Sequence, residues 1–506
     1  MVSFIEMKFK AGITVVIFVL ISLTLIIFRK HLDENLFQLF SLIGSLASLF
    51  GLLFVWIKPS DVAEGDTTSG KHLYALLAMF ILVGLFLFWS SSHKQVPPTI
   101  VKASLGKMNY PLPDKPSIAV LPFDNMTGDT SQDYLSDGIS ENIISALSGI
   151  SNLFVIARNS TFTYKGKPVK VQQVSEDLGV RYVLEGSVQK SGSRYRFTAQ
   201  LIDAIKGNHL WSEKYDRELK DLFMVQDEIT KEIITALNVE LTQGEQARTA
   251  SKGTDNLEAY LKIMQAREQV YKHNVESNAL GQQLAQEALA LDPNYATAIR
   301  ILGVTHMHDV LLGSSESPKK SLGEAIKLVK RAVELDDLDG YNHVVLGFML
   351  VLVRQYDMAV AEAERGVALD PNVADAYGWL GMVYRYVGRW DEAVVAYEKA
   401  IRLNPIPPDF YLYGLGLSYA WTGRYEEAIT EFEKAIQNHP DTFYVRLFAA
   451  AVYSLAGRDE EARAEAAEVL RQNPRFSLEK WEKSLRYKNR EDQERFISAL
   501  SKAGLN

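Results

Sequence analysis

Residues 377–405 read YGWLGMVYRYVGRWDEAVVAYEKAIRLNP, and this stretch decides the fold of the second half of the chain. It holds two runs with apolar residues at helical spacing, a glycine between the runs and a proline after the second. The following stretch repeats the pattern about 34 residues later. The matching pairs are Leu380 and Leu415, Gly381 and Gly416, Tyr384 and Tyr419, Ala393 and Ala428, Tyr397 and Phe432, Ala400 and Ala435, and Pro405 and Pro440. A fixed period of this length predicts stacked copies of one helical hairpin.

The hairpin resembles the tetratricopeptide repeat (TPR), with its consensus W/Y-x2-L-G-x2-Y followed by A-x3-F/Y-x2-A. The small residues Gly381 and Ala393 let the two helices of a copy approach closely. With weaker copies included, residues 255–476 hold about six hairpins, enough to bury a continuous core. Residues 477–506 are charged on one face and are expected to form a capping helix. The resemblance implies an all-α TPR superhelical solenoid that presents a groove to other proteins.

Three apolar runs without Asp, Glu, Lys or Arg lie at the other end of the chain, at residues 11–28, 36–57 and 73–89. A helix needs about 17–25 such residues to cross a bilayer. The alternative for the first run is a signal peptide, but Phe28-Arg29-Lys30 follows it where a small-residue cleavage site is needed. We therefore expect residues 1–90 to be a membrane anchor with three transmembrane α-helices.

Residues 117–243 have the pattern of a small α/β domain. Short apolar runs typical of buried strands alternate with helical segments, and two later runs alternate apolar and polar side chains as antiparallel strands do. The expected strands include residues 117–123, 153–157, 182–188 and 195–202. Ahead of this domain, residues 91–116 hold five prolines and are expected to form an extended, Pro-rich linker.

Three stretches of the α/β region carry a second resemblance. They are SIAVLPFDNMTGD…YLSDGISENIISALS within 117–148, ARNSTFTYKGKPVKVQQVSEDLGVRYVLEGSVQKSGSRYRFTAQLIDAIKGNHLWSEKYDR at 157–217 and DLFMVQDEITKEI at 221–233. This wording is similar to the TolB-amino-terminal-like (FlgO-like) domain of bacterial signalling proteins. There the domain lies between a membrane helix and TPR repeats, behind an adenylate or guanylate cyclase domain or a winged-helix DNA-binding domain. This sequence shows neither domain before its apolar runs, so neither output is carried over.

The charges around the apolar runs give only a slight preference for one membrane orientation. Lysines and arginines are nearly balanced between the two sides, and Lys8 and Lys10 favour an N-terminus inside the cell. Three crossings then place the later domains outside. With the bacterial resemblance, the expected location is the inner (cytoplasmic) membrane, multi-pass, with the C-terminal domains in the periplasm.

The composition argues against several kinds of site. The formal net charge is −8, which disfavours general nucleic-acid binding. The chain has no cysteine, so disulfides, thiolate metal sites and cysteine nucleophiles are excluded. Residues 65–71 match the first part of a P-loop, but His72 stands where the loop needs Ser or Thr. We expect no catalytic residue, no cofactor and no metal.

Two loops of the α/β domain remain open as ligand contacts. The acidic turn at residues 124–129 follows a strand and precedes a helix, a common place for a ligand in α/β folds. Arg158, Asn159 and Ser160 follow the second strand in the same way. Turn chemistry and helix capping are the alternative interpretation of both.

The groove of the solenoid is the stronger candidate for a binding site. In TPR domains the first helix of each pair lines the concave face, and that pattern is carried over position by position. Aromatic and arginine side chains on such a face are typical of interface hot spots. Simple packing between adjacent helices is the alternative. The candidate partner-binding residues are Tyr341, Phe348, Met382, Arg385, Tyr386, Tyr413, Leu417 and Trp421.

The sequence thus favours a non-enzymatic, membrane-anchored TPR scaffold that binds protein partners at the bacterial cell envelope. The alternative is a transmembrane sensor whose α/β and TPR region detects a ligand or protein and signals through a separate effector. A cyclase-related enzyme is a third hypothesis, against which the missing catalytic domain argues. The expected partners are a protein or peptide in the TPR groove and the membrane; a homo-oligomer stays open.

Overall fold

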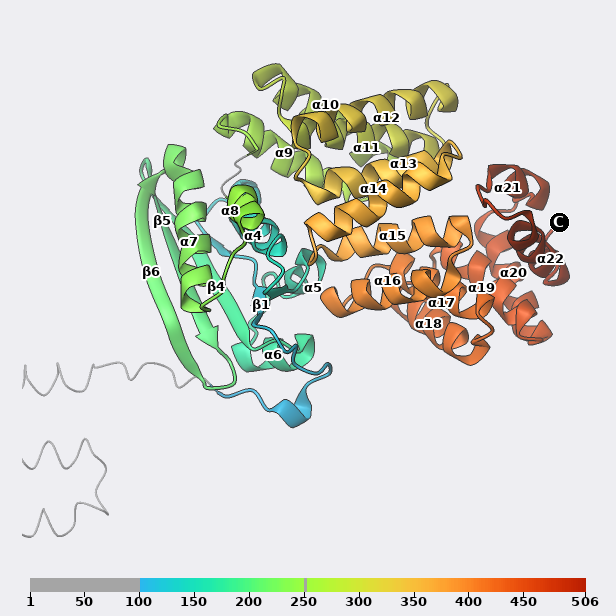
Figure 1. The fold of residues 1–506 in the computed structure, drawn as a ribbon, viewed down its shortest axis with the longest axis horizontal. Coiled ribbons are helices and arrows are strands. Elements are labelled where there is room, and N and C mark those ends of the chain that lie inside the picture. Colours follow the sequence, from blue (N-terminus) through green and yellow to red (C-terminus); the bar gives the residue numbers. More distant parts are fainter. Residues whose placement is uncertain (1–100, 250–252) are drawn as a thin grey trace, which may run out of the picture. The chain divides into compact units, whose positions relative to one another are not determined.

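The computed structural model describes residues 101–249 and 253–506 (Figure 1). Its strands gather in one sheet near the start of this part, and helix pairs follow in sequence order. The sheet and the helix pairs belong to one compact unit of the chain.

The sheet is mixed, with strand order β3-β1-β4-β5-β6 and the short β2 beside β4. Strands β1, β3 and β4 are parallel, whereas β4, β5 and β6 form an antiparallel meander. In register, Ile118 faces Val155 on one side, and Tyr182 pairs with Asp203 across the first hairpin. The strands are β1 (Ser117–Val120), β2 (Asp124–Met126), β3 (Phe154–Val155), β4 (Tyr182–Ser191), β5 (Arg194–Asp203) and β6 (Asn208–Glu218).

The two faces of the sheet are covered differently. Successive side chains of a strand point to opposite faces, so Ile118 and Val120 lie on one face and Ala119 on the other. The first face packs against α4 (Asp133–Ser148) and α7 (Leu222–Ala236). The second packs against α6 (Val171–Leu178), and its hydrophobic cluster continues into the solenoid. One core therefore joins the α/β domain to the repeats.

Short elements complete the α/β domain. Of the predicted linker, Ala103 donates its N–H to Ala204 O at 2.8 Å and Ser104 donates to Glu176 at 2.8 Å. The end of that segment therefore packs on the domain. The short elements are η2 (Leu105–Lys107), η3 (Thr130–Gln132), α5 (Arg158–Phe162), η4 (Leu219–Asp221) and α8 (Gln243–Thr249).

The remaining helices stack as antiparallel pairs, each packed against the next. The first helices of the pairs are α9 (Leu257–Val270), α11 (Ala296–Leu311), α13 (Gly340–Leu352), α15 (Ala374–Val387), α17 (Asp409–Trp421) and α19 (Phe443–Leu455). The second helices are α10 (Val275–Leu291), α12 (Pro318–Leu335), α14 (Tyr356–Leu369), α16 (Trp390–Leu403), α18 (Tyr425–Asn438) and α20 (Asp459–Gln472). Two further helices, α21 (Leu478–Ser484) and α22 (Arg490–Lys502), end the chain.

Small residues set the close approach within each pair. A Cβ on Gly381 of α15 would lie 2.9 Å from the ring of Tyr397, which is fully buried on α16. A Cβ on Gly416 of α17 would lie 2.7 Å from Phe432 on α18. Each of these two repeats thus fits an aromatic ring of its second helix against a glycine of its first.

The fold class predicted from the sequence needs a correction. Within residues 101–249 and 253–506, no helix is both long and apolar enough to cross a membrane. The 18-residue α12, for example, carries Lys319, Lys320 and Lys327 among its charges. The structure supports an α/β region with an all-helical TPR solenoid, and the three predicted transmembrane helices lie outside the described residues. A multi-pass protein of the bacterial inner membrane is likewise not supported.

Candidate functional site

The candidate groove residues lie on the first helices of three consecutive pairs. Tyr341 and Phe348 are on α13, Met382, Arg385 and Tyr386 on α15, and Tyr413, Leu417 and Trp421 on α17. Helix α15 contacts both α13 and α17, so the set forms one continuous face. The sequence pattern therefore brings these residues together as a surface of neighbouring helices.

Contacts with the chain itself already bury most of this face. Leu417 is 0% exposed and Arg385 is 3% exposed, while Tyr341, Tyr386 and Tyr413 are half-buried. The ring of Phe348 lies 4.6 Å from that of Trp379, and the ring of Tyr413 lies 5.0 Å from that of Phe448. Much of the apolar character of this face thus serves packing between adjacent repeats.

One part of the face is covered by residues 485–496, which we call the C-terminal segment. Its Tyr487 ring lies 5.3 Å from Tyr386, and its Asp492 accepts hydrogen bonds from two indoles. The Arg495 guanidinium lies 5.0 Å from the Trp421 ring. The sequence predicted a capping helix here. Nothing in it indicated that Tyr487 and Asp492 would lie on the candidate groove residues, because they are far away along the chain.

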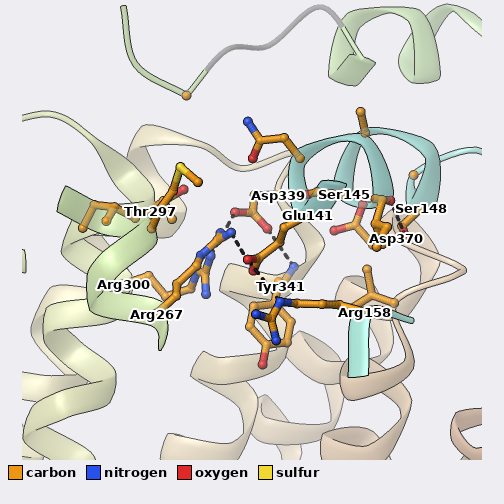
Figure 2. Close-up of a pocket in the computed structure, with 18 of the residues that line it drawn as sticks. Glu141, Ser145, Ser148, Arg158, Arg267, Thr297, Arg300, Asp339, Tyr341 and Asp370 are labelled. Carbon is orange, nitrogen blue, oxygen red and sulfur yellow. Dashed lines mark hydrogen bonds and ion pairs between the residues drawn. The ribbon is translucent and has the colours of Figure 1, made fainter. Parts of the chain in front are cut away.

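A cavity of about 400 Å³ lies between the α/β domain and the first helices of the solenoid (Figure 2). Helices α4 and α5 line one side of this interdomain cavity, and α9, α11, α13 and α15 line the other. Tyr341 at the start of α13 and Asp375 at the start of α15 line it as well. The cavity therefore adjoins the end of the candidate groove opposite to the C-terminal segment.

A half-buried carboxylate holds the two sides of the interdomain cavity together. Glu141 of α4 pairs with Arg158 of α5 at 3.3 Å and with Arg267 of α9 at 3.2 Å. Figure 2 shows the three side chains directed toward one another. Because Arg267 belongs to the solenoid, this ion trio crosses the boundary between the domains.

Arg300 of α11 is less well satisfied. Its nearest carboxylate oxygen is Asp339 Oδ2 at 3.9 Å, and its guanidinium lies 4.8 Å from the Tyr341 ring. The side chain is buried, and its Nε makes no hydrogen bond to any described residue. An arginine in this state has donor capacity left for an acceptor that enters the cavity.

Burial shifts the pKa of Asp375, which lines the cavity, and of two histidines, His273 and His308. It raises the pKa of Asp375, whose carboxylate accepts a hydrogen bond from the Tyr411 hydroxyl. It also lowers the pKa of His273, and together with His273 it lowers the pKa of His308 to about 4. The two imidazole rings lie 5.1 Å apart and stay neutral near pH 7. Within the residues that the structure describes, no cluster of three or more His, Cys, Asp or Glu could hold a metal ion.

The two loops that the sequence left open as ligand contacts have different roles in the structure. In the acidic turn, Asn125 Oδ1 accepts from the Thr127 N–H at 3.0 Å, and Asp129 caps the 3-10 helix η3. Turn chemistry therefore accounts for that loop. By contrast, Arg158 lines the interdomain cavity, and Ser160 donates to Asn404 of the solenoid at 2.5 Å. The second loop is an interdomain contact.

Comparison with protein families matches three parts of the chain. Residues 374–406 and 422–478 match two models of the tetratricopeptide repeat, which confirms the predicted TPR repeats. Residues 114–232 match the second domain of HilA/YgeH-like transcriptional regulators. The last match covers the α/β region, for which the sequence suggested a different family.

A curated relative shares a large part of the sequence. A protein of Rhizobium meliloti (strain 1021), named as a putative adenylate cyclase, is 44% identical over 248 residues, which are 49% of this chain. The matched stretch is 42% of the relative's own length. The two chains are homologous there, and the activity in the relative's name does not follow for this chain.

Solved structures that are similar to part of this chain at low overall similarity include proteins described as TPR proteins. A thermophilic TPR protein of Thermus thermophilus is 23% identical, covering 39% of this chain and 99% of its own, with a TM-score of 0.29. The MamA protein is 27% identical, covering 35% of this chain and 90% of its own, with a TM-score of 0.26. YrrB, described as a TPR protein with an unusual peptide-binding site, is 24% identical, covering 40% and 96%, with a TM-score of 0.26.

Proposed function

We propose that this chain is a non-catalytic TPR scaffold that binds a protein partner, with an extended segment of the partner on the concave face of α13, α15 and α17. The observation that carries the proposal is the row of aromatic side chains with one buried arginine along these helices. The ring of Trp379 lies 4.6 Å from Phe348 and 5.7 Å from Phe410. Such rings supply large contact area at low entropic cost, which suits peptide recognition.

The experiment compares co-purification of a partner with the full chain and with a double variant, Tyr386→Ala with Trp421→Ala. We expect the variant to lose the partner while it keeps its helical content and a cooperative melting curve. A second variant, Val395→Ala, is the control, because Val395 is 67% exposed on α16, a second helix. Retention of the same partner by the folded double variant would contradict the proposal.

A sensor role is the second candidate, and the interdomain cavity favours it. A ligand there would touch both domains, and Arg300, which lines the cavity, has an Nε that makes no hydrogen bond to any described residue. A thermal-shift titration with citrate, a compact carboxylate probe, tests this role against Arg300→Met. We expect citrate to raise the Tm of the parent chain and not that of the variant. Equal shifts would count against the cavity as an anion site.

The α/β domain, over residues 117–243, is proposed to be a TolB-amino-terminal-like unit that orients the repeats. Its mixed sheet and the helices α4 and α7 on one face support this assignment. Catalysis is not part of the proposal. Incubation of the purified full chain with ATP should therefore yield no cyclic AMP above a protein-free blank, and turnover that follows the protein through purification would overturn this point.

A further inference from the structure

The C-terminal segment is held by its main chain as well as by its side chains. The single hydrogen of the Tyr356 hydroxyl is shared between Arg486 O at 3.1 Å and Tyr487 O at 3.3 Å. The Lys488 N–H donates to Tyr386 O at 2.7 Å. Main-chain hydrogen bonds to an extended segment do not depend on its side chains, and peptide-binding surfaces use them for affinity.

A strained residue in the turn between α13 and α14 takes part in these contacts. Arg354 has φ +61, a left-handed conformation, and it stands where the next three repeats have Gly388, Gly423 and Gly457 with positive φ. An L-residue in this conformation is destabilised by about 1–2 kcal/mol. The Arg354 guanidinium donates to Leu485 O at 3.4 Å. The third pair thus carries an unfavourable residue that binds the C-terminal segment.

Two side chains of the segment fit specific receptors. Tyr487 is 4% exposed, and its ring lies between those of Tyr386 and Trp390, at 5.3 and 6.1 Å. Asp492 accepts from Trp390 Nε1 at 3.2 Å and from Trp421 Nε1 at 3.0 Å. An indole N–H is a donor only, so a carboxylate between two of them is a matched acceptor. The recognised pattern is an aromatic residue followed five positions later by an acid.

A C-terminal helix that only covers the last repeat would not need to contact earlier repeats through Tyr487 and Asp492. Phe496 of α22 does cover α19, with its ring 5.7 Å from Phe448. Residues 485–492, however, reach back to α13, α14 and α15, well before the last pair. Their ion pairs there are weak, since Lys488 pairs with Asp357 at 2.9 Å and both side chains are largely exposed. The segment therefore covers part of the candidate groove with polar contacts and with the buried side chains of Leu485, Tyr487 and Phe496.

We propose that the C-terminal segment is a ligand held in cis. It occupies the groove, and a partner segment of the same chemistry replaces it. That segment is a peptide with an aromatic residue in an extended stretch and, five positions later, an acid in the first turn of a helix, as Tyr487 and Asp492 of α22 are here. The proposal rests on the proposed function of the concave face and adds the partner's recognition pattern and its regulation. A free groove exists only when Tyr487 and Asp492 have left the Trp390–Trp421 receptor.

A peptide-binding experiment on the full chain tests the proposal. The probe is a fluorescein-labelled peptide with the sequence of residues 484–497, SLRYKNREDQERFI. The loosened chain carries Tyr487→Ala with Asp492→Ala, and the control chain carries Glu494→Ala, a position on α22 whose only ion pair is to the exposed Arg490 among the described residues. We expect the probe to bind the loosened chain at least about tenfold more tightly than the parent or control chain, read by fluorescence anisotropy. A probe with alanine at the Tyr and Asp positions should not bind.

Three outcomes would overturn the proposal. The first is a folded loosened chain that binds no probe, because the segment is then a structural cap only. The second is equal probe affinity for loosened and parent chains. The third is a parent chain that exchanges its segment with a second copy as a stable dimer in sedimentation velocity. If the loosened chain fails to fold, Arg354→Gly replaces it, since this change frees Leu485 O without opening the core.

The parent chain, the loosened chain and the probe also distinguish a failure of this proposal from a failure of the proposed scaffold function. Binding of the probe to the loosened chain, with no partner captured by parent or loosened chain, would leave the cis ligand standing and remove the scaffold function. Capture of one partner by the parent and loosened chains with equal affinity would support the scaffold function and remove the cis ligand. A partner that binds the loosened chain more tightly, and that the probe displaces, supports both.

Discussion

The ring of Tyr397 shows how single residues set the spacing of the repeats. A Cβ on Gly414 of α17 would lie 2.3 Å from Tyr397 Cζ, so α16 and α17 meet with no room for a methyl group. We expect Gly414→Ala to lower the free energy of unfolding by about 1–3 kcal/mol, as overpacking does. Urea unfolding followed by circular dichroism measures this change.

Gly323 of α12 is the matched control for that change. Nothing lies within 4 Å of a Cβ placed there, so Gly323→Ala adds no clash. Alanine is the better helix former, and we expect a gain of up to about 1 kcal/mol. The two substitutions should therefore have opposite signs. Equal effects at the two positions would show that propensity and not packing governs Gly414.

His308 is the residue whose protonation we expect to affect stability. Burial, with repulsion from His273, lowers its pKa from 6.5 to about 4. The unfolded chain therefore binds the proton more tightly than the folded chain does. The folded state has its full stability above pH 6.5, and it loses free energy of unfolding as the pH falls toward 4. Between pH 7.5 and 5 this amounts to about 2 kcal/mol.

The variant His308→Leu checks this sign, with the exposed His209→Gln as its control. We expect the loss of Tm between about pH 7.5 and pH 5 to be smaller in His308→Leu than in the parent chain, and unchanged in His209→Gln. A parallel pH dependence in all three chains would mean that His308 does not contribute to the acid sensitivity.

At the scale of elements, the turn between α13 and α14 allows the effect of backbone strain to be tested apart from the effect of its contact with the C-terminal segment. Arg354→Gly relieves the left-handed strain and removes one contact to Leu485 O. We expect a free energy of unfolding that is equal or higher by about 1 kcal/mol, together with faster hydrogen exchange at the Lys488 N–H. Hydrogen–deuterium exchange with mass spectrometry reads the exchange, and urea unfolding reads the stability.

Gly423→Arg provides the reverse change in a turn without that contact. Gly423 has φ +83, so the arginine introduces strain, and nothing lies within 4 Å of a Cβ placed there. We expect a loss of about 1–2 kcal/mol with unchanged exchange at Lys488. Slower exchange in Arg354→Gly would contradict the role given to the turn between α13 and α14.

The helix pairs and their seams were readable in the sequence because each depends on residues close along the chain. Gly381 belongs to one repeat with Tyr397, and its position in the repeat predicted a close approach of the two helices, which the structure shows at the Tyr397 ring. The position of Asp492 was not readable, since its two indole partners precede it by 102 and 71 residues. A charged capping helix has the same local pattern whichever surface it covers, and only three-dimensional packing distinguishes the possibilities.

The candidate site was therefore predicted only in part. The pattern placed the eight groove residues on neighbouring helices, but it gave no measure of how far they are buried by their own chain. Arg158 was flagged as a loop residue, whereas its cavity partners Glu141 and Arg267 lie in helices that look ordinary in sequence. Ion pairs between domains leave no period or motif to detect. The partner-binding role of the groove stays a prediction.

For the whole molecule, the shared core predicts that the α/β domain and the repeats unfold together. Asn372, buried in the loop before α15, donates to Ser148 O at 3.2 Å and to Ile150 O at 2.8 Å. Asn372→Ala leaves these carbonyls without their partner, and we expect a loss of about 1–3 kcal/mol within a single transition. Differential scanning calorimetry measures it, with Asn438→Ala on the exposed end of α18 as the control. Two separate transitions in the parent chain would show that the domains are independent.

The contacts at the two ends of the first helices have a mechanical consequence. A solenoid whose repeats touch only their neighbours behaves as an elastic coil. Here the loops before α15 and α17 are fastened to the α/β domain through Asn372 and Asn404, while the opposite ends of α13, α15 and α17 are fastened to residues 485–496. The contacts at both ends therefore hold the rotation and rise from one of these repeats to the next, which is the pitch of the coil. Release of the second fastening would let the coil stretch, so that force or a bound partner could set its pitch.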